Sequence, residues 1–354
     1  MQKINLMGYS RQELTQFIED IGEKSFRASQ IWSWMYMKGV TSFAGMTNIS
    51  RELQQKLDGI AAIRSLKLVE KKRSPLSGTE KFLWELEDGL RIESVYIPEK
   101  GRRTVCLSTQ VGCALGCTFC ATGRMGFARN ATCYEIVDQV LSVGRQVGQK
   151  PTNIVVMGMG EPFLNYENVM KALAILNDPE GVAIGSRKIT ISTAGIVPQL
   201  YRYSEEGRPF RLAVSLNATT ESQRSRIMPI NKTYPIHQLL KVAREYTKKR
   251  RKRLTFEYVL LKGVNDTPED GRRLLQLLKG IPSKVNLIAY NATTNGYTRP
   301  DEESLRAFAE SIRPLCAPVT LRLSRGSDID AACGQLAVQN PKISKVTEDH
   351  QNSA

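Results

Sequence analysis

Three cysteines, Cys113, Cys117 and Cys120, lie close together in the run Val111-Gly-Cys-Ala-Leu-Gly-Cys-Thr-Phe-Cys-Ala-Thr-Gly123. This Cys-x3-Cys-x2-Cys spacing supplies three thiolates from one short loop, and thiolates select zinc or iron–sulfur clusters. A 4Fe-4S cluster held by four cysteines is closed and transfers electrons. With three cysteines, one iron stays free to bind a small molecule. The spacing therefore predicts an open iron–sulfur site.

Zinc is the main competing interpretation of these thiolates. It normally takes four ligands from Cys and His. The chain has two histidines, His237 and His350, and neither is near in sequence, although Cys106 or Cys133 would complete a zinc site. Gly112 and Gly116 indicate a tight loop, which is a poor place for cysteines that only pack in a core.

The chain is strongly basic. Its 354 residues carry 50 Lys and Arg against 35 Asp and Glu, a net charge of +15. Such an excess attracts polyanions, of which nucleic acid is the usual one. Basic residues cluster in the runs Lys248–Arg253 and Lys71–Arg73. A solvated basic surface accounts for the same excess, so charge alone leaves both interpretations open.

Composition predicts a cytoplasmic globular protein. Hydrophobic residues make up 41% of the chain, and no stretch approaches the ~20 apolar residues of a membrane span. The first residues contain no apolar signal-peptide core. Cysteines in a reducing compartment serve as metal ligands or catalytic thiols rather than as structural disulfides.

The N-terminal part is predicted to be helical and then to change to strands. Ser10 and Ser50 are typical helix N-caps, each followed by apolar residues at helical spacing. An apolar-rich stretch, Arg27–Lys38, lies between them. Strand patterns follow at Leu66–Val69, Lys81–Leu86 and Arg91–Ile97. We expect an RNA-binding accessory domain over residues 1–98, made of helices and a small β unit.

Strands and helices alternate from Thr104 onward. The predicted strands are Thr104–Ser108, Asn153–Met157, Lys188–Ser192, Arg211–Leu216, Leu254–Leu260, Lys284–Ile288 and Val319–Leu323. The predicted helices are Thr132–Val147, Tyr166–Asn177, Pro198–Ser204, Pro235–Lys249, Pro268–Leu278 and Glu302–Ser311. This alternation predicts an α/β core, a parallel sheet with crossover helices, over residues 99–340. A disordered tail is expected over 341–354.

Polar candidates follow the ends of the predicted strands. Cys113 follows the first strand and Gly160 the second, Ser192 and Ser215 fall at the ends of the third and fourth, and Asn291 follows the sixth. In parallel βα barrels, chemistry is located at the carboxyl ends of the strands. We therefore expect these residues to meet in one site.

Together these segments resemble the RlmN/Cfr family of radical S-adenosylmethionine (SAM) adenosine methyltransferases. The resemblance extends over about residues 93 to 336. Its matching segments are Cys106-Leu-Ser-Thr-Gln-Val-Gly-Cys113, Gly158-Met-Gly-Glu-Pro162, Ile191-Ser-Thr-Ala-Gly195, Ala213-Val-Ser-Leu-Asn-Ala218 and Gly326-Ser-Asp-Ile-Asp-Ala-Ala-Cys-Gly-Gln335. Five such segments in the same order are highly specific.

The resemblance implies a fold and two cofactors. The fold is a partial (β/α)6 radical SAM barrel with an N-terminal helical and small β accessory domain. The cofactors are a 4Fe-4S cluster, ligated by Cys113, Cys117 and Cys120, and SAM on its open iron. The residues that would contact SAM are Gly160, Glu161, Ser192, Ser215, Leu216, Asn217 and Asn291.

The resemblance also implies covalent catalysis, since adenine carbon 2 has no acidic proton and cannot attack a methyl group directly. Cys333 would take a methyl group from one SAM. A radical made from a second SAM would then activate that methyl group for addition to the base. Cys106 would resolve the protein–RNA adduct through a transient disulfide, and Glu93 would be the proton acceptor.

The segment around Cys333 is closer to the RlmN type, so we expect methylation of carbon 2 of an adenosine in 23S rRNA and in tRNA beside the anticodon. Cfr-type methylation of carbon 8 is the alternative within the family. A non-catalytic RNA-binding protein with a structural metal site is the alternative outside it. The expected partners are RNA and an electron donor such as flavodoxin or ferredoxin. No membrane is expected, and the protein is expected to be a monomer.

Overall fold

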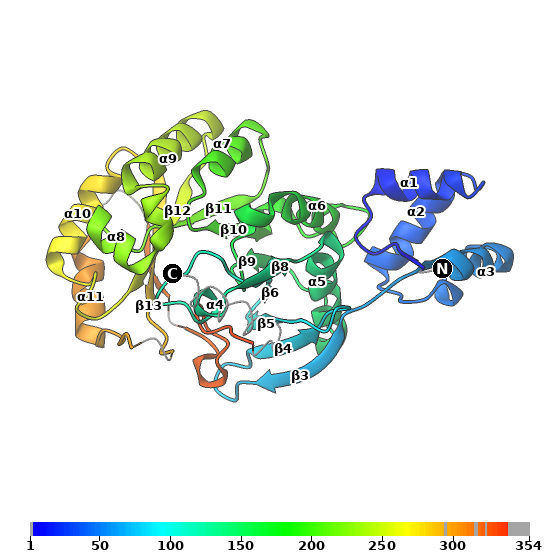
Figure 1. The fold of residues 1–354 in the computed structure, drawn as a ribbon, viewed down its shortest axis with the longest axis horizontal. Coiled ribbons are helices and arrows are strands. Elements are labelled where there is room, and N and C mark those ends of the chain that lie inside the picture. The colour runs from blue at the N-terminus through cyan, green and yellow to red at the C-terminus, as the bar shows by residue number, and fades with distance from the viewer. Residues whose placement is uncertain (1–2, 294–295, 315–317, 323, 339–354) are drawn as a thin grey trace, which may run out of the picture.

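The computed structural model describes residues 3–293, 296–314, 318–322 and 324–338 (Figure 1). The tail expected over residues 341–354 lies outside this range, as does Cys316. No helix in the described ranges is long and apolar enough to cross a membrane.

One sheet of ten strands organises the described part of the chain, in the order β14-β13-β12-β11-β10-β9-β6-β5-β4-β3. The strands from β6 to β14 pair in parallel. They are β6 (Arg102–Cys106), β9 (Asn153–Val156), β10 (Ile189–Thr193), β11 (Arg211–Ser215), β12 (Leu254–Leu260), β13 (Ser283–Ala289) and β14 (Val319–Arg322). This parallel series confirms the predicted partial barrel.

Helices connect the parallel strands and cover their outer face (Figure 1). They are α5 (Cys133–Val147), α6 (Tyr166–Asn177), α7 (Val197–Glu205), α8 (Glu221–Ile227), α9 (Ile236–Arg250), α10 (Pro268–Leu278) and α11 (Glu302–Ser311). Only α8 had no counterpart among the predicted helices. Tyr258 of β12 stacks on Phe308 of α11 with ring centroids 5.4 Å apart, so the helix-facing side of β12 is the side on which Tyr258 lies.

Three antiparallel strands extend the same sheet. They are β3 (Lys67–Arg73), β4 (Glu80–Glu85) and β5 (Arg91–Glu99). β5 pairs with β6 from Val95–Cys106 to Glu99–Arg102. The sequence analysis grouped these strands with the N-terminal helices, whereas hydrogen bonding makes them part of the barrel sheet. The domain division at residue 98 stays a prediction, although the sheet crosses that position.

The N-terminal helices form a separate lobe beside the barrel (Figure 1). They are α1 (Arg11–Asp20), α2 (Phe26–Trp32), a π-helical turn (Ser33–Met37) and α3 (Arg51–Ile60). The predicted N-caps are confirmed, because the Ser10 hydroxyl accepts the Glu13 N–H and the Ser50 hydroxyl accepts the Leu53 N–H. An ion pair of 2.7 Å from Arg11 to Asp178 ties this lobe to the segment after α6.

Candidate functional site

The cysteine loop lies between β7 (Gln110–Gly112) and the short helix α4 (Ala121–Arg124), and β7 pairs with β8 (Phe127–Asn130). Gly112 has φ of +77°, and a Cβ there would meet the Gly126 carbonyl oxygen at 2.0 Å. The Cys113 N–H donates to that same oxygen at 2.7 Å. The loop closes on itself through the Cys120 N–H, which donates to the Cys117 carbonyl at 3.1 Å. Backbone contacts therefore fix the path that presents the three thiols.

The three thiols are crowded by protein and by one another. Burial raises the pKa of Cys113 to about 12 and raises the pKa of Cys117 and Cys120. Repulsion from Cys113 and Cys120 adds to the shift at Cys117. Thiols in this environment are bound as thiolates only when a metal supplies compensating positive charge.

The donor set fits a multi-iron cluster better than a single zinc ion. Three sulfurs on one zinc would lie about 3.8 Å apart, given Zn–S distances near 2.3 Å. In the described ranges, no three Cys, His, Asp or Glu side chains converge in this way. Of the possible fourth ligands, Cys133 lies on α5 among charges from Lys171 and Glu13. His237 is exposed and pairs with Glu221, and His350 is outside the described residues.

Cys333 is brought beside the cysteine loop by direct hydrogen bonds. The Ala121 N–H donates to the Gly334 carbonyl at 2.8 Å. On the other side, the Asn291 amide donates to the Cys333 carbonyl at 3.0 Å. The predicted site residues at the ends of the first and sixth barrel strands thus meet at one loop.

Both candidate catalytic thiols lie in this region. Burial raises the pKa of Cys333 to about 12, and the charges of Cys120 and Cys106 add to the shift. Cys333 as a residue is nevertheless exposed, so this crowded thiol belongs to a segment at the protein surface. Cys106 ends β6, and burial raises its pKa to about 12 as well.

Glu93 is a buried, engaged carboxylate, unlike the solvated side chain usual for a strand glutamate. It lies on β5 with one oxygen 3.0 Å from the Lys81 ammonium and the other accepting the Ala337 N–H at 3.1 Å. Burial raises the pKa of Glu93, and Lys81 opposes that shift. Lys81 also donates to the Asp330 carbonyl at 3.2 Å. The pair thus contacts the chain on both sides of Cys333.

Gly160 and Glu161 follow β9, as predicted. Gly160 has φ of +96°, and a Cβ there would meet Gln110 at 2.5 Å. The Glu161 carboxylate accepts the Phe163 N–H at 3.0 Å and the Ala194 N–H at 2.7 Å. Its side chain therefore joins the ends of β9 and β10, which leaves the backbone of this turn to face a ligand.

The remaining predicted pocket residues divide into two kinds. Ser192 and Ser215 present hydroxyls 3.5 Å apart on neighbouring strands. Leu216, by contrast, is fully buried in the core. Asn217, in the left-handed region with φ of +58°, accepts the Val259 N–H at 2.9 Å. The side chains of Leu216 and Asn217 hold the strand ends together, so only their backbone is available to a ligand.

Sequence reasoning missed Arg224 of α8, which is fully buried. Its guanidinium donates to the carbonyls of Ala194 at 2.6 Å, Ser215 at 3.2 Å and Leu216 at 3.1 Å. Burial lowers the pKa of Arg224 to about 10, so it remains charged at neutral pH. The available signal was weak: Ile227, an apolar residue three positions on, shares its helix face, but arginine is ordinarily exposed.

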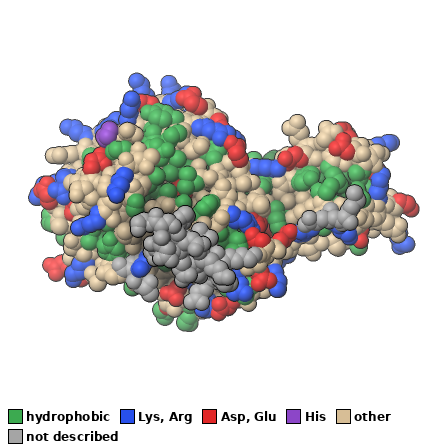
Figure 2. Space-filling model, in the orientation of Figure 1, with side chains coloured by type: hydrophobic (Ala, Val, Ile, Leu, Met, Phe, Trp, Pro, Cys, Tyr) green, Lys and Arg blue, Asp and Glu red, His purple; other side chains and the backbone are tan. Residues whose placement is uncertain are grey.

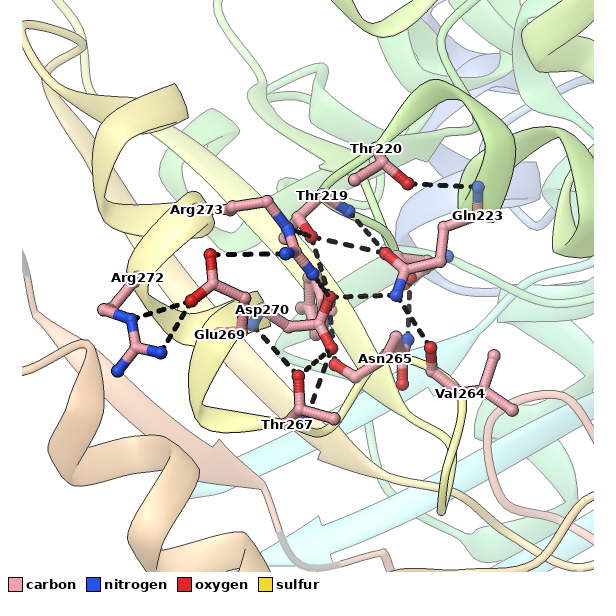
Figure 3. A network of polar contacts seen from close by, with 12 residues as sticks. Thr219, Thr220, Gln223, Val264, Asn265, Thr267, Glu269, Asp270, Arg272 and Arg273 are labelled. Carbon is pink, nitrogen blue, oxygen red and sulfur yellow. Dashed lines mark hydrogen bonds and ion pairs between the residues drawn. The ribbon is translucent and has the colours of Figure 1, made fainter.

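A polar network steadies the same end of the barrel (Figure 3). Asp270 at the start of α10 accepts hydrogen bonds from Thr219 at 2.9 Å and Gln223 at 2.9 Å, and it pairs with Arg273 at 2.6 Å. The network joins the loop after β11 to α8 and α10.

The chain is similar to known proteins along most of its length. Residues 4–63 match the family model "Ribosomal RNA large subunit methyltransferase N-terminal domain", and residues 107–278 match "Radical SAM superfamily". The chain is 46% identical over 335 residues to a probable dual-specificity RNA methyltransferase RlmN of Thermotoga neapolitana, covering 95% of this chain and 98% of that protein. It is 45% identical over 344 residues to the dual-specificity RNA methyltransferase RlmN of Anaeromyxobacter dehalogenans, covering 95% and 92%.

A solved structure is also similar. The crystal structure of a radical SAM methyltransferase from Sphaerobacter thermophilus superposes with a TM-score of 0.91 at 40% identity. The match covers 95% of this chain and all of that one.

Proposed function

Because the chain belongs to the RlmN family of radical SAM RNA methyltransferases, we propose that it methylates carbon 2 of an adenosine in 23S rRNA and in tRNA. The relatives are dual-specificity RNA methyltransferases, so carbon-8 methylation is not favoured. A non-catalytic RNA-binding role is not favoured either.

Membership of the radical SAM superfamily implies a 4Fe-4S cluster and SAM. Cys113, Cys117 and Cys120 would hold the cluster, and Gly160, Glu161, Ser192, Ser215, Leu216, Asn217 and Asn291 would contact SAM. When bound, the cluster supplies the electron that converts SAM into a radical able to take hydrogen from a methyl group.

The protein's own part in the chemistry is carried by two thiols. The Cys333 sulfur would bond to the methyl carbon of one SAM as the carbon–sulfonium bond breaks, releasing S-adenosylhomocysteine. After that carbon has joined adenine, the Cys106 sulfur would attack the Cys333 sulfur. The sulfur–carbon bond then breaks with its electron pair passing to the carbon, which takes up a proton to become the methyl group on adenine. The disulfide that remains would be reduced by the electron donor before the next turnover. The hydrogen bond of 2.8 Å from the Ala121 N–H to the Gly334 carbonyl, which holds the Cys333 segment against the cysteine loop, is the observation that supports this proposal.

Glu93 would accept a proton in this sequence. A carboxyl whose pKa burial raises is a stronger base than an ordinary glutamate. Its bonds to Lys81 and Ala337 fix its orientation beside the Cys333 segment.

RNA would be held by the basic surface. Lys and Arg side chains are spread over the face in Figure 2, with Asp and Glu among them. The run Lys248–Arg253 ends α9 and precedes β12, at the end of the strand away from the cysteine loop. Part of the run is engaged within the protein: Lys249 pairs with Glu205, and Arg250 donates to the Gly207 carbonyl. Its free members would contact phosphates distant from the target base.

The test is to incubate wild-type protein and two variants with unmodified rRNA, SAM and a reductant. Digested RNA is then analysed by mass spectrometry. Wild type should form 2-methyladenosine. Cys106→Ala should accumulate a covalent protein–RNA species, and Cys333→Ala should form neither adduct nor product while keeping its iron. Normal turnover by Cys106→Ala without trapped RNA would contradict the assignment.

A further inference from the structure

The barrel interior carries a row of polar side chains on four neighbouring strands. Ser192 on β10 and Ser215 on β11 have hydroxyls 3.5 Å apart. Ser215 pairs in register with Glu257 on β12, and Glu257 with Asn286 on β13. The Asn286 amide donates to one Glu257 oxygen at 2.9 Å. The two serines are the residues that family resemblance assigns to SAM, and Glu257 and Asn286 extend the row beyond them.

Glu257 faces the interior of the barrel. Successive side chains of a strand point to opposite faces of the sheet. The next residue, Tyr258, stacks on Phe308 of the outer helix α11. Glu257 therefore points away from the helices, toward the side on which Ser192 and Ser215 meet.

The second oxygen of Glu257 has no hydrogen-bond partner within the described part of the chain, and the residue is only 4% exposed. An unsatisfied buried carboxylate oxygen is costly. The charge of Arg322 on β14 favours the ionised form of Glu257, and the Glu257 carboxylate in turn raises the pKa of Cys333. Such an oxygen is suited to accept a hydrogen bond from a ligand.

We propose that Glu257 binds the ribose of SAM, with its free oxygen accepting a hydrogen bond from a ribose hydroxyl. Adjacent strands lie about 4.8 Å apart, so Ser215 and Glu257 are spaced to contact one small ligand. A carboxylate that accepts from a ribose hydroxyl is a recurring device in nucleotide sites. This inference rests on the proposed function, because SAM is the nucleoside assigned to the two serines.

An adenosine of the RNA substrate offers the same kind of donor, so the test separates the two sources. Holoenzyme free of RNA is titrated with S-adenosylhomocysteine and with its 2′-deoxy and 3′-deoxy analogues by calorimetry. Glu257→Gln keeps the shape and the bond from Asn286, but it replaces the free carboxylate oxygen with an uncharged NH2 donor. We expect it to lose about tenfold in affinity for S-adenosylhomocysteine. We also expect one of the two deoxy analogues to bind wild type more weakly than S-adenosylhomocysteine does. The same analogue should bind Glu257→Gln nearly as tightly as S-adenosylhomocysteine binds that variant.

The control is Glu310→Gln, an exposed carboxylate on α11, which should bind like wild type. Iron content and the unfolding midpoint show that Glu257→Gln is folded and loaded. The proposal is overturned if Glu257→Gln binds S-adenosylhomocysteine as tightly as wild type does. If that variant also binds RNA more weakly than wild type, the free oxygen contacts the RNA adenosine instead. If wild type shows the ribose effect yet methylates no RNA, the proposed function fails and this inference stands.

Discussion

Replacing Arg224 by methionine should loosen the SAM end of the barrel more than any exposed substitution on the same helix. Arg224 donates to the three carbonyls of Ala194, Ser215 and Leu216, where β10 and β11 end. Methionine has a similar length and fills most of the same space, so cavity formation is a small part of the effect. What is lost is the donor that these strand ends share.

The size of the effect follows from those bonds. Each buried acceptor left without a donor costs ~1–3 kcal/mol, and three such acceptors give roughly 3–9 kcal/mol. Arg224→Met no longer buries a charged guanidinium, and the loss of that desolvation penalty, several kcal/mol, offsets part of this cost. A net loss of about 2–5 kcal/mol remains. With an unfolding entropy of about 2.1 cal/mol/K per residue, the melting temperature should fall by roughly 3 to 7 °C.

The assay compares Arg224→Met with Arg226→Met, a matched change at an exposed position of α8. Melting and urea unfolding give stability, and calorimetry gives affinity for S-adenosylhomocysteine. Arg224→Met should lose both stability and at least about tenfold in affinity, while Arg226→Met should keep both. Equal melting temperatures for the two variants would refute the reasoning, because they would mean that the strand ends do not depend on the buried guanidinium.

Other variants test the metal site, the RNA surface and the interior carboxylate. Anaerobically purified protein should be brown with about four irons per chain. Replacing Cys113, Cys117 or Cys120 by Ala should remove iron and activity, and a colourless active protein with one zinc would contradict this. Charge reversal of Lys248, Arg251 and Arg253 should weaken rRNA binding without changing methylation of Cys333 by SAM. Each lost phosphate contact should reduce the slope of log affinity against log salt by somewhat under one, and an unchanged slope would mean that the run is only a solvated surface. Burial raises the pKa of Glu257, so folding favours its protonated form. As the pH rises from the ordinary glutamate pKa through the raised pKa, the free energy of unfolding of ligand-free wild type should therefore fall relative to that of Glu257→Gln. Urea midpoints at pH 5 and pH 8 measure this, and a difference that is the same at both values would count against it.

The barrel was predictable because its periodic signals are local. Apolar runs of strand length alternate with helical patterns from Thr104 onward, and α6 coincides with the predicted Tyr166–Asn177. The hairpin β7–β8 was not predictable from such patterns, since its strands are short and Gly112 is needed for the approach of Gly126. Nor was the pairing of β5 with β6, because a strand pattern does not specify which neighbour a strand will choose.

In the candidate site too, the sequence indicated which residue types matter, but it did not indicate which partners they contact. Spacing predicted a role for the three clustered thiols, and family resemblance predicted roles for Cys333 and Cys106; these roles stay predictions. Neither could show that Glu93 is paired with Lys81, because ion pairing across strands depends on register. Arg224 escaped notice for a related reason: a buried arginine is explained only by the carbonyls that surround it, and these belong to strands distant in sequence.

The antiparallel extension gives the barrel something that the parallel strands alone do not supply. Cys333 lies on a segment after the last strand, and a free segment would not hold a methyl-carrying sulfur at one place. A hydrogen bond between Ala121 and Gly334 joins it to the cysteine loop, and Asn291 joins it to the segment after β13. Lys81 and Glu93, from β4 and β5, hold the backbone at Asp330 and Ala337 on either side of it. The backbone around Cys333 is thus held from three directions, and two successive reactions at one sulfur, as proposed for Cys333, require such positioning.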